Sequence, residues 1–210
     1  MTTVIAFLSQ KGGVGKSTLA RALAREAAVG GLQVKVADLD PDQGTLIDWH
    51  RVRVNKAIVP AISVELFRTA AEALVAADRY DLLIIDGPAK ASTSTLEIAR
   101  KADLIVQPTG SSGDDLKPAI RVFHGLVKEG IPKDRLTFAL NRIGTESEAA
   151  LARAYIDEAG YTTLPGYLPE RPAYRQAQTD GYAVTETRFQ GLKERADSLI
   201  QGLIDTVSNG

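Results

Sequence analysis

The chain has 210 residues, with 25 Lys and Arg against 26 Asp and Glu, so it has room for one sizeable domain but offers no overall positive charge to nucleic acid. It has no cysteine and only two histidines, His50 and His124, which excludes disulfides, thiolate catalysis, iron–sulfur clusters and metal sites built from cysteine or histidine. No apolar run approaches the ~20 residues of a membrane-spanning helix, and the first residues lack the basic start of a signal peptide, so we expect a cytoplasmic protein.

Short apolar runs alternate with amphipathic patterns along the whole chain. In chain order they predict strand 4–8, helix 17–29, strand 33–38, helix 45–55, strand 61–64, helix 68–78, strand 82–86, helix 92–101, strand 104–107, helix 114–129, strand 135–140, helix 146–159 and helix 186–207. Continuous apolar strands that alternate with helices are typical of an α/β fold, a doubly wound, mostly parallel sheet with helices on both faces. Because no linker or repeat interrupts the pattern, we expect residues 1–210 to form a single domain.

The first loop has the sequence SQKGGVGKST, residues 9–18, and joins a strand to a helix. Glycines there let the backbone curl around a phosphate at the positive end of the helix dipole. Lys16 is expected to reach the β- and γ-phosphate oxygens and Ser17 to ligate Mg²⁺. The expected nucleotide-binding residues are Gly12, Gly13, Val14, Gly15, Lys16, Ser17 and Thr18.

Three carboxylates follow predicted strands. The sequence ADLDPDQ, residues 37–43, places Asp38 and Asp40 at the end of the second strand, and DLLIIDGPA, residues 81–89, places Asp86 at the end of the fourth. Ligands bind at this edge of a doubly wound sheet, so these side chains are expected to face the phosphates, with Asp86 holding Mg²⁺ through a water. For Asp42 we expect only a helix cap.

The loop differs from the general pattern G-x-x-x-x-G-K-[ST], because Gln10 replaces the first glycine and Lys11 follows it. KGGVGKS is a deviant Walker A motif, and the chain resembles the ParA/MinD group of P-loop ATPases through most of its length. The resemblance implies a P-loop NTPase fold and the cofactors ATP and Mg²⁺. It also implies that Asp40 orients the attacking water and, with Ser17 and Asp86, belongs to the metal site.

The resemblance also implies a base pocket. Asn141, at the end of the sixth strand, matches the adenine-contacting asparagine of the family. The segment LPERPAYRQA, residues 168–177, resembles its proline-containing loop and suggests Pro169 as a second contact. An ordinary turn that opens a helix is an equal alternative for this segment.

Lys11 has no obvious task beside the nucleotide of its own chain, because Lys16 and the loop amides already serve that nucleotide. A second flexible ammonium is best used on a phosphate held elsewhere. The resemblance implies a homodimer closed over two ATP molecules, in which each Lys11 contacts the partner's nucleotide. It would then stabilise transition-state charge as an arginine finger does.

Gln10 and DLDPDQ have the ParA form, and we expect no helix-turn-helix region before the first strand, as in small ParA proteins. That resemblance implies a nucleoid-associated ATPase that binds DNA non-specifically as an ATP dimer. A ParB-like or cargo-adaptor protein would stimulate its weak hydrolysis, and it would position a plasmid, a chromosome or another cargo. The candidate DNA contacts are Arg171, Arg175, Arg188, Lys193 and Arg195; a solvated surface of mixed charge is the alternative for each.

Two other functions stay open. The first is a MinD-like positioning ATPase at a membrane, which would use the apolar stripe of helix 186–207, namely Phe189, Leu192, Ala196, Leu199, Ile200, Leu203, Ile204 and Val207. We expect this stripe to pack on the sheet instead and expect no membrane partner, since Asp197 and Asp205 are acidic and no Lys or Arg follows Arg195. The second is a metabolic P-loop enzyme, for which the sequence shows no substrate site.

Overall fold

The computed structural model describes residues 2–41, 44–88 and 93–208. The strands are β1 Thr3–Phe7, β2 Val34–Asp38, β3 Ser63–Leu66, β4 Leu82–Asp86, β5 Leu104–Thr109, β6 Leu136–Ile143, β7 Thr162–Thr163 and β8 Leu168–Pro169. The α-helices are α1 Lys16–Val29, α2 Thr45–Asn55, α3 Ala70–Ala76, α4 Thr93–Lys101, α5 Gly113–Lys128, α6 Glu146–Glu158, α7 Pro172–Thr179 and α8 Gln190–Ser208, with 3-10 turns at Lys133–Arg135 and Val184–Glu186.

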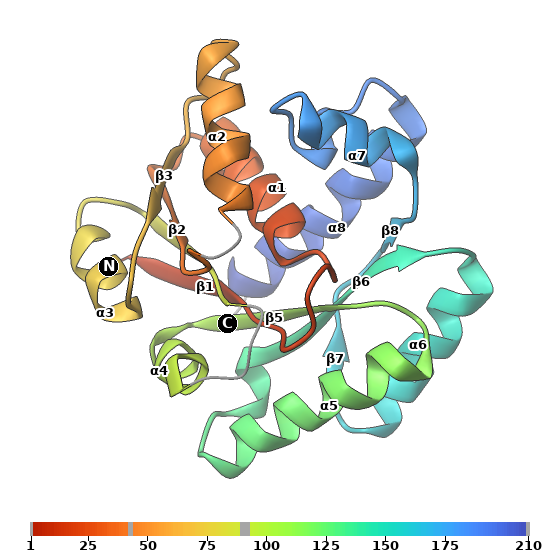
Figure 1. The fold of residues 1–210 in the computed structure, drawn as a ribbon. Helices are drawn as coiled ribbons and strands as arrows, with labels where there is room; N and C mark the ends of the chain where they lie inside the picture. The colour runs from red at the N-terminus through yellow and green to blue at the C-terminus, as the bar shows by residue number, and fades with distance from the viewer. Residues whose placement is uncertain (1, 42–43, 89–92, 209–210) are drawn as a thin grey trace.

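One sheet organises these elements (Figure 1). Its strand order is β3-β2-β4-β1-β5-β6-β7. Strand β8 also pairs with β6, nearer to the carboxyl end of β6 than β7 does. Every one of these pairings is parallel. The predicted doubly wound α/β fold is therefore confirmed. All the carboxyl ends of the strands meet at one edge, the edge where such a sheet binds ligands.

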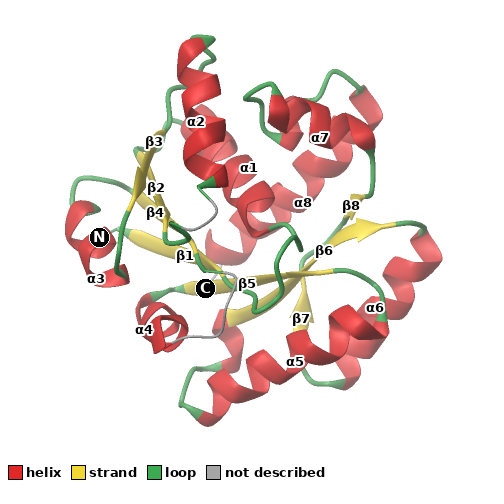
Figure 2. Ribbon diagram, in the orientation of Figure 1, coloured by secondary structure: helices red, strands yellow, loops and turns green. Residues whose placement is uncertain are grey.

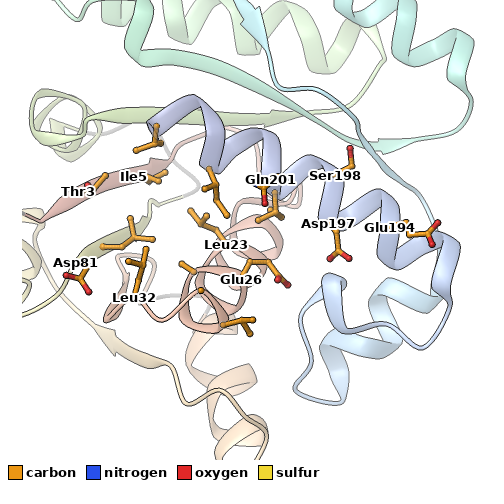
Figure 3. Close-up of a pocket in the computed structure, with 17 residues that line it drawn as sticks. Thr3, Ile5, Leu23, Glu26, Leu32, Asp81, Glu194, Asp197, Ser198 and Gln201 are labelled. Carbon is orange, nitrogen blue, oxygen red and sulfur yellow. The ribbon is translucent and has the colours of Figure 1, made fainter. Parts of the chain in front are cut away.

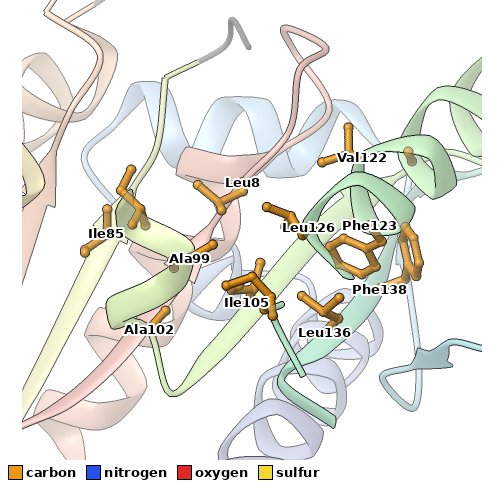
Figure 4. Packing of buried hydrophobic residues seen from close by; sticks show 14 of the residues in the cluster. Leu8, Ile85, Ala99, Ala102, Ile105, Val122, Phe123, Leu126, Leu136 and Phe138 are labelled. Carbon is orange, nitrogen blue, oxygen red and sulfur yellow. The ribbon is translucent and has the colours of Figure 1, made fainter. Parts of the chain in front are cut away.

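The helices cover the sheet in two layers (Figure 2). Helices α3, α4, α5 and α6 lie over one face, where residues such as Ile85, Phe123 and Phe138 pack together (Figure 4). Helices α1, α2, α7 and α8 lie over the other face, around Phe7, Leu23 and their neighbours. The strands are buried on both faces, which explains why their sequences read as continuous apolar runs.

Each predicted strand is present, with its ends shifted by at most three residues. The third strand begins two residues later than expected, and the sixth extends to Ile143. The short strands β7 and β8 and helix α7 were not predicted, because two-residue strands and an eight-residue helix leave little periodic signal.

The last helix begins four residues later than predicted, because residues 184–186 form a 3-10 turn. Phe189 therefore precedes the helix and is 47% exposed rather than part of its buried stripe. The centre of the stripe packs into the core as expected, since Ala196, Leu199 and Ile200 are at most 1% exposed. None of the helices in the described part of the chain has the length and hydropathy needed to span a bilayer.

Candidate functional site

The glycine-rich loop lies between β1 and α1, at the carboxyl edge of the sheet. Gly13 and Gly15 have φ angles of +74° and +110°, in the region that favours glycine. A Cβ atom at Gly15 would lie 1.9 Å from Asn141 Nδ2, so no larger residue fits there without a shift. Gly15 caps α1 without a side-chain hydrogen bond to the helix, which leaves the first backbone N–H groups directed at the loop.

A cavity of about 220 Å³ opens beside this loop. Its lining residues are Gly13, Gly15, Lys16, Ser17, Thr18, Arg21, Asp40, Thr45, Asp86, Gly87 and Arg142. The loop residues, Asp40 and Asp86 were predicted from separate motifs, and the fold brings them together around one hollow. The combination of backbone donors, a lysine and carboxylates is suited to a phosphate chain with a bound cation.

Lys16 begins α1 and is only 8% exposed. Burial lowers the pKa of its ammonium, and the nearby carboxylates of Asp86 and Asp40 oppose that change. A buried cation with carboxylates on one side gains a further partner when a phosphate enters the cavity. Lys16 therefore lines the cavity as a buried cation, and its binding to phosphate oxygens stays a prediction.

Asp86 and Ser17 form the candidate metal position. Ser17 Oγ donates a 2.5 Å hydrogen bond to Asp86 Oδ2, and Asp86 is 2% exposed. Burial raises the pKa of Asp86 to about 7, with Asp38 adding to the effect and Ser17 opposing it. Asp86 Oδ1 is buried and finds no hydrogen-bond partner among the described residues.

These oxygen donors fit Mg²⁺. A cation beside Asp86 would satisfy its orphaned oxygen and return the carboxyl to its charged form. The described residues contain no group of three His, Cys, Asp or Glu side chains that could hold a metal unaided. That is the expected condition for Mg²⁺, which keeps several waters and takes further oxygens from the nucleotide phosphates.

The aspartates of β2 lie beside Asp86 because of the sheet register. Asp38 is opposite Asp86 in the parallel β2–β4 pair. Its Oδ1 atom accepts a 2.9 Å hydrogen bond from the backbone N–H of Asp40, and burial raises its pKa. Asp38 thus fixes the turn that carries Asp40, whose side chain reaches the cavity. Asp42, for which a capping role was expected, lies outside the described residues.

Asn141 braces the glycine-rich loop from behind. It is 6% exposed, and its Nδ2 atom donates a 2.6 Å hydrogen bond to the carbonyl of Val14. Strand β8 pairs with β6 so that Leu168 lies opposite Asn141 and Pro169 opposite Ile143. Asn141 and Pro169 line one small cavity of about 70 Å³ that shares Gly13, Gly15, Thr18 and Arg142 with the larger one. The two predicted base contacts are thus neighbours, and their contact with adenine stays a prediction.

Lys11 does not line the 220 Å³ cavity. Its Nζ atom lies 2.5 Å from Asp115 Oδ1, in the first turn of α5, and its side chain is 51% exposed. Burial raises the pKa of Asp115, but hydrogen bonds from Lys11 and Ser112 outweigh this effect and leave the pKa lowered. In the single chain Lys11 is therefore held by its own subunit, and its contact with a partner's nucleotide stays a prediction.

The sequence analysis missed Arg21, which is 8% exposed and lines the 220 Å³ cavity. Its guanidinium donates to Gln178 Oε1 at 3.1 Å and to the Thr45 carbonyl at 2.6 Å. Burial lowers its pKa to about 10, so it stays charged at neutral pH. The available signal was its spacing of four residues from Ser17, which places both on one face of α1. Arg21 ties α1 to α2 and α7 beside the candidate phosphate cavity.

Arg142 was missed as well. It has a φ angle of +58°, lines both cavities and forms a 3.5 Å ion pair with Glu170. The available signal was its place beside Asn141 at the carboxyl end of β6, the edge of the sheet where ligands bind.

The five basic residues proposed as DNA contacts do not form one unbroken patch. Arg171 and Arg175 line the smaller cavity, and Arg175 pairs with Glu170. Arg195 stacks over Tyr167 at 5.2 Å and lies 3.9 Å from Glu146. Arg188 lies over the ring of Phe189, and Lys193 is half-buried near Asp197. Acidic residues are interleaved with them, as the alternative of a mixed-charge surface requires, and DNA contact stays a prediction.

Comparison with known proteins gives consistent matches. A family model described as the CobQ/CobB/MinD/ParA nucleotide binding domain matches residues 5–184. The chain is 28% identical over 194 residues to "Maintenance of carboxysome distribution protein A" of Gloeobacter kilaueensis, covering 91% of this chain and 88% of that protein.

Two solved structures share the fold. MinD from Pyrococcus horikoshii, complexed with Mg-ADP, is similar with a TM-score of 0.73 and 20% identity, over 97% of this chain and 96% of that one. An ATP complex of a McdA variant from Cyanothece is similar with a TM-score of 0.72 and 18% identity, over 96% of each chain.

Proposed function

Because the chain belongs to the CobQ/CobB/MinD/ParA family of nucleotide-binding domains, we propose that it is a Mg-ATP-dependent ATPase of the ParA type. It dimerises on ATP, binds DNA without sequence preference and positions a large cargo on the nucleoid. One observation carries the proposal: Lys16, Ser17, Asp40 and Asp86 converge on one cavity although they come from three separate segments of the chain.

In this proposal the residues around the cavity have separate roles. The loop amides and Lys16 bind the phosphates, while Ser17 and Asp86 hold the hydrated metal and Asp40 orients the attacking water. When bound, Mg²⁺ would supply positive charge to the phosphate oxygens. Arg21 keeps α1 and α2 in register, so that Asp40 and the phosphate site keep their spacing.

Dimerisation completes the site through Lys11. When two subunits close, Lys11 leaves Asp115 and turns to the partner's nucleotide, where its charge stabilises the transition state. The exposure of Lys11 supports this, because an ammonium that is half exposed can change partners without crossing a packed core.

The cargo and its adaptor complete the proposal. A cargo-bound adaptor protein stimulates hydrolysis and releases the dimer from DNA. The relative from Gloeobacter kilaueensis is named for carboxysome distribution, which favours a protein assembly over a plasmid or chromosome as the cargo. The MinD-like alternative requires a face for the membrane, and the centre of the apolar stripe of α8 is already buried in the core.

The central test is the variant Lys11→Ala. We expect it to bind ATP with unchanged affinity but to lose ATP-dependent dimerisation in analytical ultracentrifugation and to lose adaptor-stimulated phosphate release. Lys16→Ala is the contrasting variant, which should lose nucleotide binding itself. If Lys11→Ala dimerises and hydrolyses ATP as the parent does, the trans role is wrong.

The DNA step has its own experiment. Retention of the protein on DNA is measured with ATP and with ADP, at low and moderate salt. Retention that requires ATP, ignores sequence and falls steeply with salt supports the proposal, because phosphate contacts release counterions. Absence of retention at low salt, combined with ATP-dependent sedimentation with anionic liposomes, would favour the MinD-like function.

A further inference from the structure

A second hollow lies at the opposite edge of the sheet from the nucleotide cavity (Figure 3). It has a volume of about 1080 Å³ and runs between the carboxyl half of α1 and helix α8. Thr3 and Ile5 of β1, with Asp81 and Leu82 at the start of β4, form its floor. We call this hollow the α1–α8 groove.

Most of the groove is apolar, and part of it is open to water. Val29, at the end of α1, is 55% exposed, and Leu32, just beyond it, is 46% exposed. Ile204 and Val207 of α8 line the same groove and are only partly buried. An apolar hollow that is partly open to water is suited to the apolar face of another molecule.

The shape of the groove fits a helix. The α8 residues that line it include positions 194, 197, 198, 201 and 204, which recur every three or four residues and so form one stripe along the helix. From position 194 to position 207 this wall is roughly 20 Å long, the length of three to four helical turns. A partner cannot bind here by adding a β-strand to the sheet, because β1 and β4 are interior strands with a neighbour on each side.

The charged side chains that line the groove are all acidic, although the cations of Arg25 and Lys193 also act on Asp197. Its lining residues include four acidic side chains and no Lys, Arg or His; the acidic ones are Glu26, Asp81, Glu194 and Asp197. Three of them already accept hydrogen bonds, from Arg25, from the Gln33 backbone and from Gln190 respectively. An anionic lipid surface would be repelled by this rim, whereas a basic segment would be attracted.

Asp197 differs from the other three. Its Oδ1 atom is buried and has no hydrogen-bond partner in the described part of the chain. Burial and the neighbouring charge of Glu26 both disfavour its ionised form. The cations of Lys193 and Arg25 oppose this effect, but neither donates a hydrogen bond to Oδ1, and a lysine or arginine placed over the groove would supply that donor.

We propose that the α1–α8 groove docks an amphipathic helix of a partner protein, with its apolar face on Val29 and Leu32 and a lysine or arginine on Asp197. The groove is lined by the amino ends of the strands, so a partner can occupy it while the nucleotide cavity at the carboxyl ends stays accessible. This inference does not depend on the proposed ATPase cycle.

The test uses two designed peptides of 16 residues with the same leucine stripe. One carries lysines beside the stripe and the other carries glutamates at the same positions. Binding to the full chain is measured by fluorescence anisotropy at low salt. We expect the lysine peptide to bind about tenfold more tightly than the glutamate peptide, because only the former complements the rim.

Two variants locate the site, and one serves as a matched control. Leu32→Ser should weaken binding of the lysine peptide about tenfold, and Asp197→Asn about threefold or more. Leu151→Ser removes an exposed leucine from α6, on the other face of the sheet, and should leave binding unchanged; Leu151 is 73% exposed against 46% for Leu32. Circular dichroism checks that each variant is folded.

The proposal is overturned if the two peptides bind equally, or if Leu32→Ser and Asp197→Asn bind the lysine peptide as the parent does. It is also overturned if the chain self-associates without nucleotide and Leu32→Ser abolishes that association. The groove would then be an interface between two copies of the chain.

Discussion

The two edges of the sheet each hold a carboxylate with an oxygen that lacks a hydrogen-bond partner among the described residues, Asp86 at one edge and Asp197 at the other. Asp86 is 2% exposed and lies among backbone N–H groups, Lys16 and a hydroxyl in a cavity of about 220 Å³. Asp197 is half-exposed on the rim of an apolar groove about five times larger. The closed polar edge suits a small hydrated cation with phosphate, and the open apolar edge suits a protein side chain.

The largest effect that would separate the two edges is expected from Gly15→Ala. The added methyl group meets the amide of Asn141, and φ at this position strains any L-residue. We expect ATP affinity, measured by isothermal titration, to fall roughly 100-fold or more while the groove still binds the lysine peptide. Loss of both activities would mean that the edges are not independent.

Two variants sharpen this result. In the Asn141→Ala background the colliding amide is absent, so Gly15→Ala should reduce ATP affinity less there than in the parent, although Asn141→Ala has a cost of its own. Gly125→Ala changes an exposed glycine inside α5, where a Cβ meets nothing within 4 Å, and is expected to stabilise the fold slightly. An equal loss of affinity on Gly15→Ala in both backgrounds would contradict the proposed collision.

A pH experiment compares the two carboxylates directly. Asp86 has a pKa near 7 in the folded chain and about 3.8 as a free side chain, so the folded state holds its proton more tightly. Its contribution to the free energy of unfolding therefore falls as pH rises from about 4 to about 7. Without nucleotide or metal, Asp86→Asn should be more stable than the parent at pH 8 by about 2 kcal/mol, and less so at pH 5.

Urea unfolding in EDTA at the two pH values measures this effect. Asp197→Asn is the control, and its pH-dependent gain should be smaller because solvent screens that carboxyl. If the free energy of unfolding rises equally for the two variants, the distinction between a closed and an open edge of the sheet is wrong. Asp86→Asn should also lose the dependence of ATP binding on Mg²⁺.

The smallest expected effect concerns Asp115. Asp115→Asn removes the ion pair that holds Lys11 in its own subunit, so the lysine is free more often. We expect the ATP-dependent dimer to form up to about sixfold more tightly for each of its two subunits, roughly 36-fold in all, since each exposed pair contributes at most ~1 kcal/mol. Ultracentrifugation over a concentration series measures the change, and weaker dimerisation would contradict the role of Asp115 as a competitor.

The sequence predicted the polar edge far better than the apolar one. The glycine-rich loop, Asp40 and Asp86 each follow a strand in a local pattern, and the parallel sheet then brings them to one place. Arg21 was within reach of the same reasoning through its spacing from Ser17, but it was overlooked.

Other features depend on contacts between distant parts of the chain. The bond from Asn141 to Val14 spans 127 residues, and the pair of Lys11 with Asp115 spans 104. The α1–α8 groove forms where two helices pack over the amino ends of the strands. The sequence pattern of either helix alone does not predict it. The late start of α8 has a similar cause: Glu186 pairs with the buried Arg53, so these residues fold as a turn.

In the proposed dimerisation cycle, the exposure of the pair between Lys11 and Asp115 sets how strongly that pair opposes dimer formation. Because the pair is worth at most ~1 kcal/mol, the lysine is released in roughly one molecule in six or more at any moment. Two such releases reduce the apparent association constant of the dimer by roughly 36-fold at most, far less than the 10⁴-fold that a decisive two-state switch needs. In that proposal the pair would oppose dimerisation only weakly and in a salt-dependent way, and ATP binding would determine whether the dimer forms.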